Sequence, residues 1–140
     1  MQIPKTKRLR LLIFSLLLVL TVGMLAGCSH TMKFSIGTAA KITVRSGRTG
    51  KTATVTDAET IRKITDNVNQ ITYQRSESSV NWMGSGDCLI WYGVDGKQME
   101  AIAVYDDDYI NYRNYFWESY GPEKLDTELY DQLLKNAESD

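Results

Sequence analysis

The sequence predicts an α+β domain in which two helices cover one face of a mostly antiparallel sheet, in the order ββαβββββα. Short runs of branched and aromatic residues, separated by turn residues, predict the strands. Two stretches with apolar residues at three-to-four spacing predict the helices. We expect one domain over residues 41–136, followed by a frayed tail over residues 137–140.

A hairpin is predicted at the start of this domain. Residues 41–45 place Ile42 and Val44 on one face, and residues 51–56 alternate apolar side chains with threonines. The glycine-containing residues 46–50 between them are typical of a turn.

A helix is expected next. Thr56-Asp57-Ala58-Glu59 resembles a capping box, in which an oxygen accepts free amides of the first turn and Glu59 reaches back. The apolar stripe that follows consists of Ile61, Ile64 and Val68, and the helix should end near Asn69.

Three strands should form the middle of the sheet. Residues 71–76 predict the first, and residues 77–87 a loop. Residues 88–94 and 97–105 flank Asp95-Gly96, a two-residue hairpin turn that needs positive φ. The expected cross-strand pairs are Leu89 with Ile102 and Ile90 with Ala101, so both sheet faces carry apolar side chains.

A second hairpin and a helix complete the pattern. Residues 109–112 and 115–118 should pair about Arg113-Asn114, and Gly121-Pro122 should end the sheet. Asp126 is expected to cap the last helix, whose buried stripe is Leu125, Leu129, Leu133 and Leu134.

Residues 1–27 have the pattern of a signal peptide. Four basic residues, Lys5, Lys7, Arg8 and Arg10, precede an apolar run over residues 11–22, and no acidic residue occurs there. The run falls short of the roughly 20 apolar residues that a spanning helix needs. We therefore expect cleavage.

The cleavage motif Leu25-Ala26-Gly27-Cys28 resembles the lipobox of bacterial lipoproteins. The resemblance implies transfer of a diacylglycerol to the Cys28 thiol, removal of the leader and anchoring of the chain at the outer face of the cell membrane. Two or three long acyl chains such as palmitate anchor durably, because each buried methylene contributes about 0.8 kcal/mol. Residues 28–40, including the single histidine His30, are expected to be a lipidated tether. The alternative is an ordinary secretory signal with a chance cysteine.

Charge and cysteine content narrow the function classes. After cleavage, 12 basic residues face 17 acidic ones, so nucleic acid is not an expected partner. The basic residues Lys41, Arg45, Arg48 and Lys51 should form a solvated hairpin end or touch anionic lipid headgroups. If Cys28 is acylated, Cys88 has no disulfide partner within the chain.

The sequence contains only weak signals for a catalytic or metal-binding site. Asp106-Asp107-Asp108 lacks the alternating spacing of a calcium loop and is expected to be a solvated turn. Cys88 has no nearby histidine and should pack as a small apolar residue, and Ser85 should lie in a flexible loop. Carboxylate pairs brought together from distant segments stay open. No cofactor or metal is expected, and the chain is not expected to be an enzyme.

The chain resembles a family of small uncharacterised lipoproteins of Gram-positive, Clostridia-like bacteria. The resemblance covers roughly residues 41–135 and implies a surface location and this fold, without an activity. It is carried by Ile42-Thr43-Val44, Arg48-Thr49-Gly50-Lys51, Val55-Thr56-Asp57, Trp91-Tyr92, Asp95-Gly96-Lys97 and Tyr115-Phe116.

Aromatic residues concentrate between residues 105 and 120, and two short strands cannot point all of them into one core. The sequence therefore favours a non-catalytic binding module whose aromatic sheet surface contacts an extracellular protein, peptide or glycan. The expected contact residues are Tyr109, Tyr112, Tyr115 and Trp117. Three alternatives remain: aromatics that simply cover the helices and sheet edges, a structural or accessory envelope lipoprotein, and an extracytoplasmic hydrolase.

Overall fold

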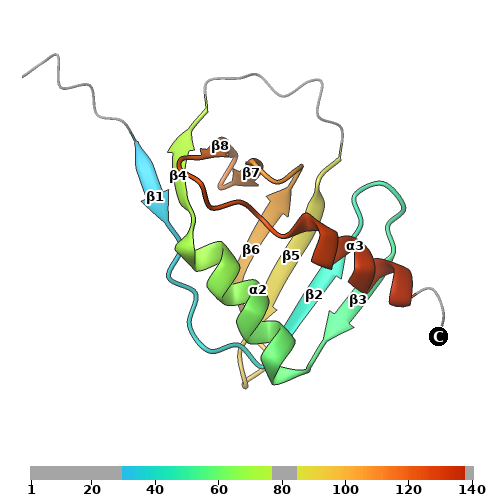
Figure 1. Cartoon of the computed structure of the whole chain (residues 1–140). Helices are drawn as coiled ribbons and strands as arrows, with labels where there is room; N and C mark the ends of the chain where they lie inside the picture. The colour runs from blue at the N-terminus through green and yellow to red at the C-terminus, as the bar shows by residue number, and fades with distance from the viewer. Residues whose placement is uncertain (1–29, 77–84, 138–140) are drawn as a thin grey trace, which may run out of the picture.

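The computed structural model describes residues 30–76 and 85–137, which form one antiparallel sheet with two helices on one face (Figure 1). The eight strands within these residues lie side by side in the order β1-β4-β8-β7-β6-β5-β2-β3. Their bounds are β1 Thr31–Lys33, β2 Lys41–Arg45, β3 Thr52–Val55, β4 Thr72–Arg75, β5 Asp87–Tyr92, β6 Gln98–Val104, β7 Tyr109–Tyr112 and β8 Tyr115–Ser119. The helices are α2, Ala58–Gln70, and α3, Thr127–Asn136.

The predicted fold class and element order are confirmed from residue 41 onward. In the β5–β6 hairpin, Leu89 lies opposite Ile102 and Ile90 opposite Ala101, as the sequence predicts. Arg113 and Asn114 have φ of 51° and 66°, the left-handed values that a tight hairpin turn between β7 and β8 requires.

The predicted two-residue turn between β5 and β6 is wrong: the Gly93 N–H donates to the Lys97 carbonyl around a three-residue loop in which Gly96, but not Asp95, has positive φ. A register shift between Trp91 and Tyr92 compensates for the extra loop residue.

The structure corrects the tether predicted over residues 28–40. Residues 31–33 form β1, which pairs with β4, and Phe34 is buried in the core. The Asn69 side chain on α2 accepts a hydrogen bond from the Ile36 N–H and donates one to its carbonyl, both at 2.9 Å. Residues 31–36 therefore belong to the domain, which begins about ten residues earlier than predicted.

The helices begin at their predicted caps. The Asp57 carboxylate accepts hydrogen bonds from the Thr60 N–H and hydroxyl, which lower its pKa. Asp57 is thus the N-cap of α2, and Thr60, not Glu59, lies three residues after it. The Asp126 carboxylate accepts from the Leu129 N–H at the start of α3.

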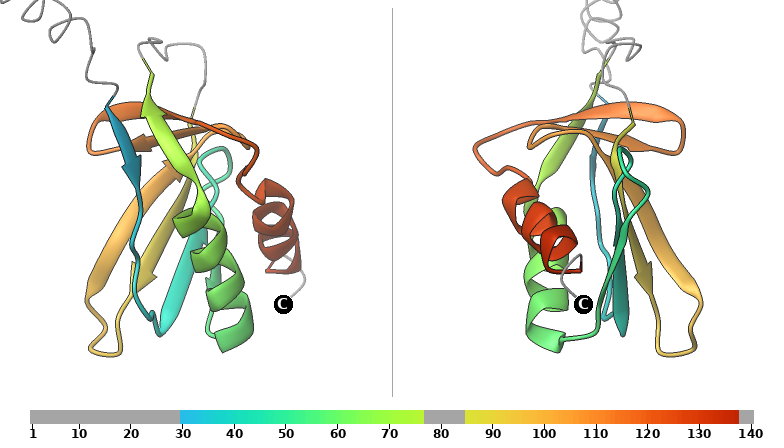
Figure 2. Two further views of the ribbon diagram at one scale, coloured as in Figure 1. Left: turned by 60° about the vertical axis from the view of Figure 1, so that its left-hand side comes forward. Right: turned by 90° about the vertical axis from the view of Figure 1, so that its right-hand side faces the viewer.

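The core lies between the helices and one sheet face (Figure 2). Trp91 is fully buried there, and its indole N–H donates to the Thr65 hydroxyl of α2 at 3.0 Å. On α3, Tyr130 and Leu134 are buried, whereas the expected Leu129 and Leu133 are partly buried. Tyr130, absent from the predicted stripe, is a principal core residue of this helix.

The opposite sheet face carries half-buried side chains. Thr43, Ile90 and Ala101 lie side by side across β2, β5 and β6 on this face, and Cys88 lies one row away. Burial raises the pKa of the Cys88 thiol and so opposes thiolate formation, although the nearby Arg45 acts in the opposite direction. Cys88 therefore packs on the outer face of a strand.

The predicted signal peptide, including Leu25, Ala26 and Gly27, lies outside the described residues, as do Cys28 and residues 138–140. Within the described part of the chain, neither helix is long and apolar enough to cross a membrane.

Candidate functional site

Strand alternation divides the four aromatic residues expected to form a contact surface. In the β7–β8 hairpin, Tyr112 lies opposite Tyr115, and Trp117 lies opposite the buried Ile110, so these side chains share the core-facing side. Tyr109 is three residues from Tyr112 and points to the other side, beside Glu118, whose carboxylate raises the pKa of the Tyr109 hydroxyl. The structure therefore keeps three of the four residues together and separates Tyr109.

Two arginines join the three remaining aromatics, and we call the set of five the aromatic–arginine surface: Arg75, Tyr112, Arg113, Tyr115 and Trp117. The Arg75 guanidinium lies 3.8 Å from the centre of the Tyr115 ring, within cation–π distance. Arg113 lies 5.1 Å from the Tyr112 ring centre. Tyr115 is 47% exposed, so this stacked pair faces solvent.

The inner edge of this surface is fixed by the core. The Tyr112 hydroxyl donates to the Glu100 carboxylate at 3.0 Å, and its ring packs edge-on against Phe34 at 4.9 Å. Burial, followed by this hydrogen bond, raises the pKa of Tyr112. The Trp117 indole N–H donates to the Tyr112 carbonyl at 3.3 Å. Tyr112 and Trp117 therefore anchor the surface to the core, and Tyr115 and Arg75 are its solvent-exposed side chains.

The start of the described chain lies beside this surface. The Arg75 N–H donates to the His30 carbonyl at 3.0 Å, and β1 then runs alongside β4. In both views of Figure 2, the start of β1 and the β7–β8 hairpin occupy one end of the sheet, and the β5–β6 turn occupies the other.

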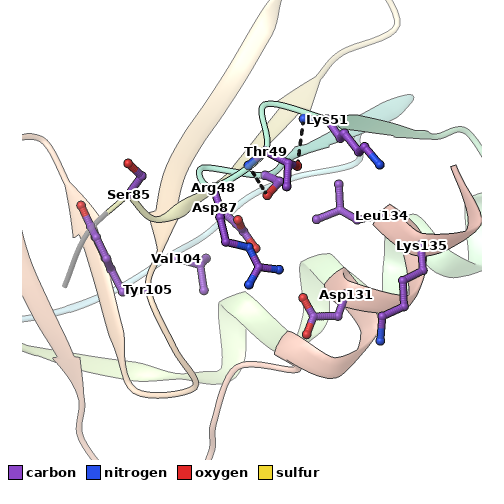
Figure 3. Close-up of a pocket in the computed structure, with 11 residues that line it drawn as sticks. Arg48, Thr49, Lys51, Ser85, Asp87, Val104, Tyr105, Asp131, Leu134 and Lys135 are labelled. Atoms are coloured by element: carbon purple, nitrogen blue, oxygen red, sulfur yellow. Dashed lines mark hydrogen bonds between the residues drawn. The ribbon is translucent and has the colours of Figure 1, made fainter. Parts of the chain in front are cut away.

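A second candidate site is a cavity of about 480 Å³, which we call the polar pocket (Figure 3). It lies between the β2–β3 turn, the beginning of β5, the end of β6 and α3. The lining residues are Ser46, Arg48, Thr49, Lys51, Ser85, Asp87, Val104, Tyr105, Asp131, Leu134 and Lys135. Three cations, two carboxylates and several hydroxyls thus surround a volume typical of small-ligand sites.

Hydrogen bonds fix the wall that the β2–β3 turn contributes. The Gly47 N–H donates to the Asp87 carboxylate at 2.9 Å, which ties the turn to β5. Within the turn, the Thr49 N–H donates to the Ser46 hydroxyl at 3.3 Å. A Cβ at Gly47 would lie 2.2 Å from the Gly86 carbonyl oxygen, so only glycine fits this close approach. The pocket is therefore largely preformed on this side.

Charged side chains face the pocket from both walls. Figure 3 shows Arg48 reaching from the turn toward Asp131 on α3. Within residues 30–76 and 85–137, neither Arg48 nor Lys135 forms an ion pair.

The predicted basic cluster loses Lys41, whereas Arg45, Arg48 and Lys51 stay at or beside the β2–β3 turn. The Lys41 ammonium lies 4.3 Å from the centre of the Tyr92 ring, at the opposite end of β2 from Arg48. Only Arg48 and Lys51 of the four line the polar pocket.

The Asp106–Asp108 carboxylates have separate partners. Asp106 accepts the N–H groups of Asp108 and Tyr109, both at 2.8 Å. Asp107 accepts from the Thr127 hydroxyl. Asp108 accepts from the Lys124 ammonium and the Ser119 hydroxyl, which hold the pKa of Asp108 below its usual range. The described residues contain no cluster of three metal-ligating side chains.

Sequence reasoning grouped Arg48 and Lys51 at one hairpin end but did not connect them to Ser85, and it missed Asp131 and Lys135. The four-residue spacing of Asp131 and Lys135 places both on one face of α3, which was the available signal. Comparisons with protein-family models, curated proteins and solved structures found no match to this chain.

Proposed function

We propose that this chain is an extracytoplasmic lipoprotein, anchored at the outer face of the cell membrane through acylated Cys28, that works as a non-catalytic binding module. The basic segment, apolar run and Leu25-Ala26-Gly27-Cys28 motif support the anchor. The preformed polar pocket is the observation that carries the binding role. The aromatic–arginine surface is a second contact surface of the same module.

The pocket chemistry favours a polar ligand that carries charge. Arg48 and Lys135 can bind a carboxylate or phosphate, and Asp131 can accept hydrogen bonds from an ammonium or hydroxyl group. The hydroxyls of Ser46, Thr49 and Ser85 add donors and acceptors. Peptides and charged glycans present these groups together, and both are abundant outside cells.

Binding of purified protein to peptide and glycan arrays tests this proposal. Arg48→Ala and Asp131→Asn should each weaken capture at least tenfold, because a charge-assisted hydrogen bond contributes about 1.5–3 kcal/mol. Lys97→Ala is the matched control, because Lys97 is an exposed cation in the β5–β6 turn region, away from the pocket. Equal capture by all variants would contradict the pocket as the binding site. If cells instead respond to loss of Cys28 and not to pocket variants, an accessory envelope role is favoured.

One observation favours a second candidate, an extracytoplasmic hydrolase. Asp87 and Asp131 are distant in sequence and line the same pocket, as a carboxylate pair for acid–base chemistry would. Asp87, however, already accepts the Gly47 N–H and holds the turn. A screen of glycosidase and peptidase substrates with wild type and Asp131→Asn separates the two functions, since turnover abolished by Asp131→Asn would overturn the non-catalytic assignment.

A further inference from the structure

We infer that the aromatic–arginine surface is seated on the membrane in which the chain is anchored, with the lipid headgroup layer as its partner. This inference rests on the proposed anchoring through Cys28. It assigns the surface to the bilayer beneath the domain and leaves the polar pocket to the ligand.

The anchor and the aromatic–arginine surface lie a short distance apart. Cys28 precedes His30 by two residues, so their Cα atoms are at most about 7 Å apart. The His30 carbonyl is 3.0 Å from the Arg75 nitrogen, and the Arg75 guanidinium stacks on Tyr115 at 3.8 Å. Because β1 begins at Thr31, only Ser29 and His30 lie between the acylated residue and the first strand in the sequence.

The side chains of this surface are also chemically complementary to a lipid headgroup layer. Tyrosine and tryptophan concentrate at membrane–water interfaces, where an apolar ring and a polar tip are both satisfied. Arginine beside them attracts anionic headgroups. Tyr115, Trp117, Arg75 and Arg113 provide this combination at the end of the domain that bears the anchor.

Two carboxylates lie near the surface. Glu100 is engaged by the Tyr112 hydroxyl, and Glu118 lies with Tyr109 on the other face of the hairpin. Although the mature chain is acidic overall, the exposed charges of this surface, Arg75 and Arg113, are positive.

Spin labels on the lipidated full-length product test this inference. In a Cys88→Ser background, Tyr115→Cys and Val94→Cys each carry one nitroxide, and the protein is reconstituted in phosphatidylcholine vesicles with or without phosphatidylglycerol. Val94 is the matched control because it is 93% exposed and lies in the turn between β5 and β6, at the opposite end of the sheet. Power saturation then compares collisions with oxygen, which enters the bilayer, and with a water-soluble nickel complex. Thermal unfolding by circular dichroism verifies that each variant is folded.

The expected result is a severalfold higher oxygen-to-nickel collision ratio at residue 115 than at residue 94, and a further increase with phosphatidylglycerol. Equal, water-like ratios at both positions would overturn the inference. A label at residue 115 that is shielded from both oxygen and nickel would also overturn it, because that pattern indicates contact with a second copy of the protein. Mass spectrometry of the same sample separates the two proposals. Acylated Cys28 together with a water-exposed residue 115 refutes only the membrane contact of the aromatic–arginine surface. Unmodified Cys28 refutes the anchoring and with it the basis of that contact.

Discussion

Replacing Phe34 by alanine should destabilise the domain strongly, although the sequence placed this residue in a tether. Phe34 is 7% exposed, and its ring packs edge-on against Tyr73 and Tyr112, with centroids 5.6 and 4.9 Å away. Truncation of a buried phenylalanine costs about 3–5 kcal/mol, of which each edge-to-face pair supplies about 0.5–1.5 kcal/mol. Because Phe34 lies near the beginning of the domain, we take the lower end, about 3 kcal/mol.

Urea denaturation followed by far-ultraviolet circular dichroism measures this change. With a slope of about 1.5 kcal/mol per molar urea, the midpoint of Phe34→Ala should fall by about 2 M. Ser35→Ala is the matched control, since Ser35 is the exposed neighbour and its truncation should change stability by no more than about 0.5 kcal/mol. If Phe34→Ala proves as mild as Ser35→Ala, residues 31–36 do not belong to the folded domain and the account of β1 fails.

Two further predictions concern the attachment of the first strand and the acid sensitivity of the fold. Asn69→Ala removes both hydrogen bonds to Ile36 and should lower the free energy of unfolding by about 2 kcal/mol. In hydrogen exchange, the amides of residues 31–36 should lose protection while those of α3 keep theirs. Uniform loss of protection across the domain would contradict local attachment. The lowered pKa of Asp108 means that the contribution of its ionised form to stability is complete above the unfolded value of about 3.9 and is lost as the pH falls through the folded pKa. The free energy of unfolding of the wild type should therefore fall more steeply below about pH 4 than that of Asp108→Asn, and parallel pH profiles would show that Lys124 and Ser119 do not stabilise the carboxylate.

Local patterns predicted most of the fold. Asp95-Gly96 marks the turn between β5 and β6, and Asp57 and Asp126 mark the helix starts, because each of these signals acts over only a few residues. The loop is one residue longer than predicted, and a register shift between Trp91 and Tyr92 restores the predicted pairs. β1 was missed for the opposite reason. Its three residues show no informative alternation, and it pairs with β4, where Thr31 lies opposite Gln74, more than forty residues away in the sequence.

The candidate sites show the same limit. The separation of Tyr109 from Tyr112 follows from their odd spacing within one strand, so the sequence contained the information that divides the aromatic cluster. The polar pocket could not be predicted this way. Arg48, Asp87 and Asp131 come from three elements, and only tertiary packing brings them together.

Acylation of Cys28 is the central claim, because it determines the location of the domain and the proximity of the aromatic–arginine surface to the bilayer. Mass spectrometry of the amino-terminal peptide, released from protein extracted from native membranes, tests it most directly. The account predicts a chain that begins at Cys28 and carries the added mass of its acyl groups. An intact leader, or a Cys28 with a free thiol, would contradict it.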